Sequence, residues 1–142
     1  MKLLTQKIIE LEMINKNSKP RLLITEDDIE NQKLLQLVLR NKFEIDICDS
    51  EQSFFDQLNQ KEYDAVIMDV TLKNGANGVD IIKELRKKSQ FKELPVVCLS
   101  ANVYGVDRIK AREAGIDVYL TKPVDNSLLI NTLNRLINKN NS

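Results

Sequence analysis

The sequence predicts an α/β fold in which a parallel five-stranded sheet is covered by helices on both faces. Short apolar segments alternate five times with segments of helical periodicity, and the connections between them are short. The third and fourth apolar segments contain unbroken apolar runs, which are typical of strands buried on both faces. The third segment, 64–69, ends in the carboxylate of Asp69, at the sheet edge where such folds place their ligands.

An additional helix is expected before the first strand. Within residues 3–16, Leu4, Ile8 and Leu11 fall on one stripe of an amphipathic helix, and a polar linker that ends at Pro20 follows. This segment could pack on the domain, pair with a second copy or be the remnant of a longer helix. We therefore expect three parts: a helical extension and linker at 1–19, one domain at 20–138 and a disordered tail at 139–142.

The elements of the domain follow from periodicity. Strands are predicted at 21–25, 43–48, 64–69, 95–99 and 118–121. Helices are predicted at 29–40, 51–60, 79–88, about 105–114 and from 126 onward. The first of these helices is expected to bury four residues, Leu34, Leu35, Val38 and Leu39. Right-handed crossovers leave few topologies, and the strand order 2-1-3-4-5 is the natural one at this length.

Several residues mark helix ends. Asp28 is expected to cap the helix at 29–40, Asp125 or Asn126 the last helix, and Gly115 is a C-cap glycine. Ser50 is expected to cap the helix at 51–60. Ser53 stands where a capping box has its acid, so the capping box is expected to be absent.

Composition excludes several classes of function. Lys+Arg and Asp+Glu are both 21, so net charge gives no reason to expect a nucleic-acid or membrane surface. The N-terminus is broken by polar residues too early for a signal peptide, and no apolar run approaches the roughly 20 residues of a membrane span. We therefore expect a cytoplasmic protein. Cys48 and Cys98 each lie in an apolar run and are expected to be buried, reduced thiols.

The chain contains no histidine. This absence excludes Ser-His and Cys-His nucleophilic catalysis, histidine-ligated metals and a role as phosphohistidine donor. Any metal site would therefore use oxygen ligands, which favour Mg²⁺ or Ca²⁺.

Polar residues follow four of the predicted strands at the edge where their carboxyl ends meet. They are Glu26, Asp27, Asp69, Ser100 and Lys122. Each alone has an ordinary explanation as a helix cap, a strand end or a solvated turn. Together they place carboxylates, a hydroxyl and an ammonium at one rim. Clustered carboxylates repel and raise each other's pKa, and a divalent cation such as Mg²⁺ removes that conflict. The vacant place between them suits a phosphoryl group, with Asp69 as the attacking carboxylate.

These motifs resemble a response-regulator receiver domain of the two-component signalling systems. The matching segments are 22–32, 66–69, 99–101 and 114–123, in the order and spacing of the family, and the resemblance covers about residues 20–138. It implies a flavodoxin-like fold and a phosphoacceptor signalling domain that is not an enzyme. It also implies that Asp69 receives a phosphoryl group from the phosphohistidine of a histidine kinase or histidine phosphotransfer protein.

The resemblance further implies a role for each matching residue. Asp27 would bind Mg²⁺ more directly, Glu26 through water, and Thr71 through its backbone carbonyl. Lys122 would pair with phosphate, and the Lys122–Pro123 peptide bond is expected to be cis. The switch residues would be the Ser100 hydroxyl and the Tyr119 ring. They would repack the face formed by the helix at about 105–114, the strand at 118–121 and the last helix, where a partner binds. A homodimer could form through this face or through the N-terminal helix.

Two departures from the family pattern are visible. The loop at 70–78 lacks the frequent proline and is one residue longer than usual. The acid pair is Glu-Asp, a pattern familiar from receivers attached to hybrid sensor histidine kinases. Thr71 and Asn102 occupy the positions that tune dephosphorylation in the family.

Alternative functions remain open at this point. The chain could be a stand-alone receiver, a phosphorelay intermediate or the receiver segment of a hybrid sensor histidine kinase. An aspartyl-phosphate type phosphatase would have a second Asp where Thr71 stands. A flavodoxin-like cofactor binder would have a Ser/Thr/Gly-rich phosphate loop after the first strand. A degenerate receiver used as a scaffold would not need the complete set of site residues.

Overall fold

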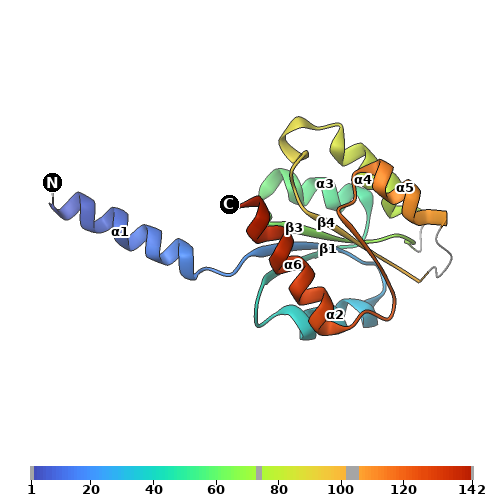
Figure 1. Ribbon diagram of the computed structural model, residues 1–142, viewed down its shortest axis with the longest axis horizontal. Helices are drawn as coiled ribbons and strands as arrows, with labels where there is room; N and C mark the ends of the chain where they lie inside the picture. Colours follow the sequence, from blue (N-terminus) through green and yellow to red (C-terminus); the bar gives the residue numbers. More distant parts are fainter. Residues whose placement is uncertain (1, 73–74, 102–105, 142) are drawn as a thin grey trace.

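The computed structural model describes residues 2–72, 75–101 and 106–141, and it contains the predicted parallel sheet (Figure 1). The strand order is β2-β1-β3-β4-β5, as predicted. The strands are β1 (Arg21–Thr25), β2 (Glu44–Cys48), β3 (Ala65–Asp69), β4 (Val96–Ser100) and β5 (Val118–Thr121). Every residue of the neighbouring strands β3 and β4 is buried, whereas the edge strands β2 and β5 are mostly half-buried. The unbroken apolar runs therefore mark the interior of the sheet.

Helices cover both faces of the sheet (Figure 1). One face carries α2 (Ile29–Leu39) and α6 (Asn126–Asn140). The other carries α3 (Glu51–Gln60), α4 (Gly78–Arg86) and α5 (Val106–Ala114), and the short 3-10 helix η1 (Ser89–Phe91) precedes β4. Successive strand residues alternate between two apolar cores, so that Leu22 and Ile24 contact the α2/α6 side and Leu23 the α3/α4/α5 side.

Two features of α2 and α6 differ from the prediction. Leu34 is 60% exposed, although it was expected to be buried. Leu39 is fully buried and Leu35, four residues before it, packs on the same core. Because each residue turns the helix by about 100°, Leu34 falls beside this stripe and faces solvent. Helix α6 continues to Asn140, two residues beyond the predicted domain end at 138.

The prediction that α3 has no capping box is wrong. The Ser50 hydroxyl accepts a hydrogen bond from the Ser53 backbone N–H at 3.1 Å. The Ser53 hydroxyl in turn accepts one from the Ser50 backbone N–H, also at 3.1 Å. A serine hydroxyl therefore reaches back to the cap as the expected glutamate would, and both orphan donors are satisfied.

The other predicted caps are confirmed. Asp28 accepts from the Asn31 N–H and Asp125 from the Leu128 N–H. Gly115 ends α5 with a φ of +96°, a conformation that favours glycine. The thiols of Cys48 and Cys98 are free and buried, as predicted, and the Lys122–Pro123 peptide bond is cis.

The additional helix α1 (Lys2–Asn17) projects away from the domain and is joined to β1 by a short linker (Figure 1). Four of its large apolar side chains are exposed: Leu3, Leu4, Ile8 and Ile9. Among the described residues, no helix combines the length and apolar character needed to cross a membrane.

Candidate functional site

The carboxyl ends of β1 and β3 bring three acidic residues together. Glu26 and Asp27 follow β1 directly, and Asp69 is the last residue of β3, the neighbour of β1 in the sheet. One carboxylate oxygen from each residue lies within 4.8 Å of the others. The convergence predicted from sequence is therefore present, because parallel pairing of β1 with β3 fixes it.

Glu26 is held firmly at the centre of the site. Its side chain is 2% exposed, and its Oε1 accepts hydrogen bonds from the Asp28 N–H at 3.1 Å and from Asn31 Nδ2 at 3.3 Å. Its backbone carbonyl accepts a bond from Gln32 Nε2 at 2.6 Å. The N-terminal end of α2 thus holds both the Glu26 carboxylate, through Oε1, and its backbone carbonyl.

The ionised form of Glu26 is nevertheless disfavoured. Burial, a hydrogen bond with Asp69 and the negative charge of Asp69 together raise the pKa of Glu26 from 4.5 to about 7. The positive charge of Lys122 and the Asp28 N–H oppose this rise without cancelling it. The acidic side chains of the site therefore carry more negative charge than the Lys122 ammonium balances.

Asp69 lies between a backbone donor and Lys122. Its Oδ1 accepts a hydrogen bond from the Thr71 N–H at 3.1 Å, and its Oδ2 is 3.4 Å from Lys122 Nζ. The same ammonium is 3.6 Å from Glu26 Oε2. The Asp69 side chain is 9% exposed, so it meets solvent through a small opening. Lys122 bridges the two acids, as its place after β5 allows.

Gly78 packs closely against the backbone of Asp69, a contact that the sequence analysis did not predict. A β-carbon at Gly78 would collide with the backbone carbonyl of Asp69 and lie 2.7 Å from Met68 Cγ. The Gly78 N–H also donates to the Val70 carbonyl at 2.7 Å. The only signal in the sequence is the Asn77-Gly78 pair, which marks a turn but does not identify what packs against it.

Ser100 and Tyr119 lie on the neighbouring strands β4 and β5. Ser100 is 2% exposed and ends β4, and its carbonyl accepts a bond from the Lys122 N–H at 2.7 Å. Tyr119 pairs in register with Cys98, and its ring centroid is 6.0 Å from the Arg108 guanidinium. The Tyr119 hydroxyl is buried and has no hydrogen-bond partner among the described residues. Asn102 lies outside the described residues, as do residues 73–74 of the loop at 70–78.

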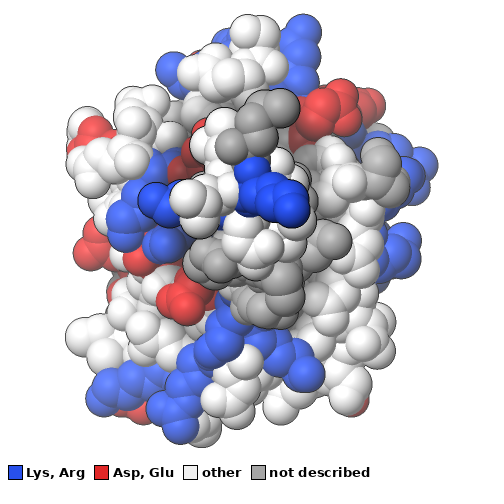
Figure 2. Space-filling view, turned by 90° about the vertical axis from the view of Figure 1, so that its left-hand side faces the viewer, with Lys and Arg blue, Asp and Glu red and all other residues white. Residues whose placement is uncertain are grey.

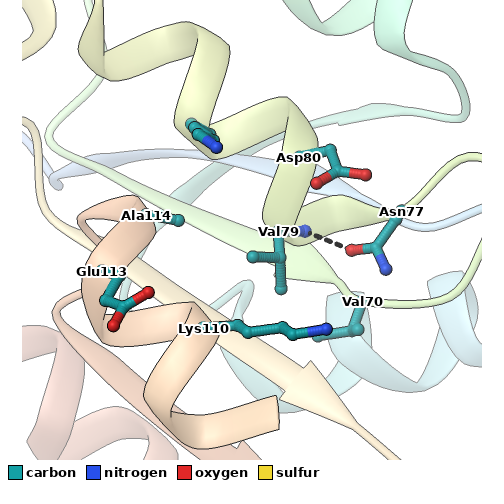
Figure 3. A pocket seen from close by; sticks show the side chains of 8 residues that line it. Val70, Asn77, Val79, Asp80, Lys110, Glu113 and Ala114 are labelled. Atoms are coloured by element: carbon teal, nitrogen blue, oxygen red, sulfur yellow. Dashed lines mark hydrogen bonds between the residues drawn. The ribbon is translucent and has the colours of Figure 1, made fainter.

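Two cavities flank the site. One, of about 410 Å³, lies between α4 and α5 and is reached by Val79 and Lys110, with Val70, the residue after Asp69, at its edge (Figure 3). Figure 3 also shows the Asn77 side chain accepting a bond from the Val79 N–H, at 2.8 Å, which caps α4. The other cavity, of about 340 Å³, lies between α2 and α6 and includes Glu26 and Lys122 in its wall.

The donor set fits a hard divalent cation. All three clustered side chains offer carboxylate oxygens, and oxygen ligands are the preference of Mg²⁺ and Ca²⁺. A cation of this class would also offset the burial and the charge of Asp69, which together raise the pKa of Glu26. The residues present are thus suited to such an ion on physical grounds.

Comparison with known proteins decides the family. The sequence pattern described as "Response regulator receiver domain" matches residues 22–134. The chain belongs to this family. This receiver domain is 34% identical over 104 residues to the phosphate regulon transcriptional regulatory protein PhoB of Escherichia coli K12, covering 72% of the chain and 45% of PhoB. It is also 34% identical over 116 residues to the sensory/regulatory protein RpfC of Xanthomonas campestris pv. campestris, covering 80% of the chain and 16% of RpfC. The chain spans less than half the length of these curated relatives.

Solved structures share the receiver fold. A putative response regulator from Chloroflexus aurantiacus superposes with a TM-score of 0.79 at 30% identity, covering 84% of this chain and 98% of that one. The receiver domain of sensor histidine kinase PA1611 from Pseudomonas aeruginosa gives 0.76 at 26% identity, covering 85% and 99%. That structure is described with a magnesium ion coordinated in its active site cleft. The fold and family predicted from the sequence are therefore confirmed.

Proposed function

We propose that this receiver domain accepts a phosphoryl group on Asp69 from the phosphohistidine of a partner protein and then changes its α5/β5/α6 face. The observation that supports this most directly is the position of Asp69. Its carboxylate lies beside two further acids and 3.4 Å from Lys122 Nζ, next to a small opening to solvent. A nucleophilic carboxylate beside a fixed cation is the arrangement that phosphoryl transfer requires.

The transfer step uses groups that the chain already holds in place. One Asp69 oxygen attacks phosphorus in line, and a P–O bond forms as the P–N bond to the partner's imidazole breaks. The electron pair of the P–N bond returns to the imidazole nitrogen, and the partner's histidine leaves as neutral imidazole because its other ring nitrogen carries a proton. Lys122 pairs with the phosphoryl oxygens, whose charge is spread in the transition state. The Thr71 N–H holds the other Asp69 oxygen in position.

The acid cluster would hold Mg²⁺, which supplies positive charge to the phosphoryl oxygens when bound. The residues assigned to it are Glu26, Asp27, Asp69 and, through its backbone carbonyl, Thr71. Support comes from the three convergent carboxylates and from the magnesium ion described in the PA1611 receiver. Bound Mg²⁺ would lower the pKa of Glu26 and keep its carboxylate ionised.

A docking surface for the phosphohistidine partner adjoins the site. The cavity between α2 and α6 is lined mainly by apolar side chains, and Glu26 and Lys122 form its polar end. Around it, large apolar residues are at least half exposed: Ile29, Leu34, Leu37 and Leu128. An apolar surface that leads directly to the acceptor carboxylate suits a helical histidine-bearing partner, either a histidine kinase or a histidine phosphotransfer protein.

The response to phosphorylation would involve Ser100 and Tyr119. Phosphorylation adds roughly −1.5 to −2 charge at Asp69. The Ser100 hydroxyl would then contact the phosphoryl oxygens on Asp69, and the Tyr119 ring would repack in response. The buried Tyr119 hydroxyl, which has no hydrogen-bond partner within the described part of the chain, and the cavity of about 410 Å³ between α4 and α5 support a face that can rearrange. The same chemistry serves a stand-alone receiver, a relay intermediate or the receiver segment of a hybrid kinase.

Intact-protein mass spectrometry after incubation with acetyl phosphate tests this proposal. We expect one phosphoryl adduct that requires Mg²⁺ and is lost in Asp69→Asn. Asp80→Asn, an exposed acid in the first turn of α4, is the matched control and should be phosphorylated like the wild type. An adduct that persists in Asp69→Asn, or that never forms on folded protein with Mg²⁺ bound, would refute the proposal.

Turnover of p-nitrophenyl phosphate with Mg²⁺ distinguishes the phosphatase alternative. That class places a second Asp where this chain has Thr71, whose side chain is exposed. We therefore expect no sustained release of phosphate. Multiple turnovers that depend on Asp69 would favour the phosphatase.

A further inference from the structure

Helix α1 has no role in the proposed phosphoacceptor site. It leaves the domain at the amino end of β1, whereas Glu26 and Asp69 lie at the carboxyl ends of β1 and β3 (Figure 1). In a parallel sheet these ends are opposite edges. Whatever covers α1 therefore leaves the site open.

In the part of α1 whose side chains the structure describes, residues 2–9, the large apolar side chains are exposed. Leu3 and Leu4 are 84% and 66% exposed, and Ile8 and Ile9 are 48% and 44% exposed. The first turn has no acidic residue to favour the helix dipole. Isolated helices shorter than about 12–15 residues are marginal in water, and this one of 16 residues is barely longer. Packing against a partner surface would stabilise it.

The sequence spacing within α1 is that of a coiled coil. Leu4, Ile8 and Leu11 are separated by four and three residues, which are the d, a and d positions of a heptad repeat. Asn15 then takes the next a position. Ile at a with Leu at d favours two parallel strands, and a single Asn at a fixes register and oligomeric state.

The charges select the same arrangement. Lys7 takes a g position and Glu12 the e position of the following heptad, so that a parallel pair places each Lys7 opposite the other copy's Glu12. An antiparallel pair would match g with g and e with e. The other residues at these positions, Ile14 and Thr5, are uncharged, so no opposite-sign pair would form.

The surroundings of α1 favour a second copy over a polyanion. Figure 2 views the molecule from the end that carries α1, and basic and acidic side chains are interspersed over the described part of this face. No single-sign surface marks it for nucleic acid or an anionic membrane. We propose that α1 pairs in parallel with α1 of a second copy, through a two-stranded coiled coil with Leu4, Ile8 and Leu11 in the seam.

Sedimentation equilibrium of the full chain tests this pairing. Because the seam is only about two heptads long, we expect a reversible equilibrium in which the mass rises from 16.3 kDa toward twice that value with concentration. Ile8→Asp should abolish the rise. Ile9→Asp is the matched control, because Ile9 is adjacent, similarly exposed and outside the seam, and it should leave the rise intact.

A charge exchange tests the orientation. Lys7→Glu should weaken association at least several-fold, and adding Glu12→Lys should restore it. A monomer at all concentrations, or a dimer that Ile8→Asp and Ile9→Asp affect alike, would overturn the proposal. Adduct formation with acetyl phosphate should be unchanged in every variant, which separates this test from that of the phosphoacceptor.

Discussion

Replacement of Glu26 by Gln should stabilise the metal-free protein while impairing its function. The pKa of Glu26 is raised from 4.5 to about 7, so the folded state binds more protons than the unfolded state between these values. The contribution of Glu26 to stability is therefore fully present below its ordinary pKa of 4.5 and is lost as the pH rises through about 7. This rise in pKa corresponds to about 3 kcal/mol against the ionised form.

The Gln variant removes that penalty. Its amide oxygen can still accept from the Asp28 N–H and Asn31 Nδ2, which now contact Glu26 Oε1. At about pH 8 in EDTA we expect it to exceed the wild type by on the order of 2 kcal/mol, or roughly 5–10 °C in Tm. At about pH 4 the two proteins should melt nearly together, because Glu26 is then protonated in the folded wild type and mostly protonated in the unfolded chain.

Thermal unfolding followed by circular dichroism, with and without Mg²⁺, measures both effects. Mg²⁺ should raise the Tm of the wild type at about pH 8 and raise that of Glu26→Gln much less. Glu30→Gln is the control, because the Glu30 side chain is 86% exposed in the same helix. If Glu26→Gln showed the same pH dependence as the wild type in EDTA, the argument that burial and the charge of Asp69 disfavour ionised Glu26 would be refuted.

Two further substitutions test contacts around the site. Gly78→Ala should lower the free energy of unfolding by about 2 kcal/mol and slow Asp69 phosphorylation, since its β-carbon would collide with the Asp69 carbonyl. Urea titration measures the stability, and mass spectrometry measures the rate of adduct formation. An unchanged stability would contradict the close packing. Tyr119→Phe removes a buried hydroxyl without a partner among the described residues, so unfolding should cost the same or up to about 1 kcal/mol more; a clear loss of stability would reveal a partner for the hydroxyl.

Much of the fold could be predicted because periodicity and topology are properties of whole segments. The alternation of strands and helices predicts the parallel sheet. The strand order then places Glu26, Asp69 and Lys122 at one edge, and this prediction requires no side-chain positions. The convergence of the site follows from this order, since β1 and β3 are neighbours.

Single contacts could not be predicted in the same way. The exposure of Leu34 depends on a rotation of the helix that the apolar pattern leaves undetermined; Leu39 is buried and Leu35 half-buried on the predicted side. The capping box of Ser50 and Ser53 depends on the Ser53 hydroxyl accepting the hydrogen bond from the Ser50 backbone N–H that a glutamate carboxylate would usually accept. The closeness of Gly78 to the Asp69 backbone depends on the path of a loop, which residue types do not specify.

The acidic cluster at the strand ends carries a cost in stability, because the ionised form of Glu26 is disfavoured there. Three carboxylates converge at the strand ends because the sheet register puts them there, and Lys122 alone bridges Glu26 and Asp69 among the described ion pairs. The two apolar cores must therefore hold the strands in register against this repulsion. Under the proposed function, a cation bound by these carboxylates would stabilise the fold and prepare Asp69 for an incoming phosphoryl group. The cost in stability and the capacity to bind are thus two consequences of the same placement of charge.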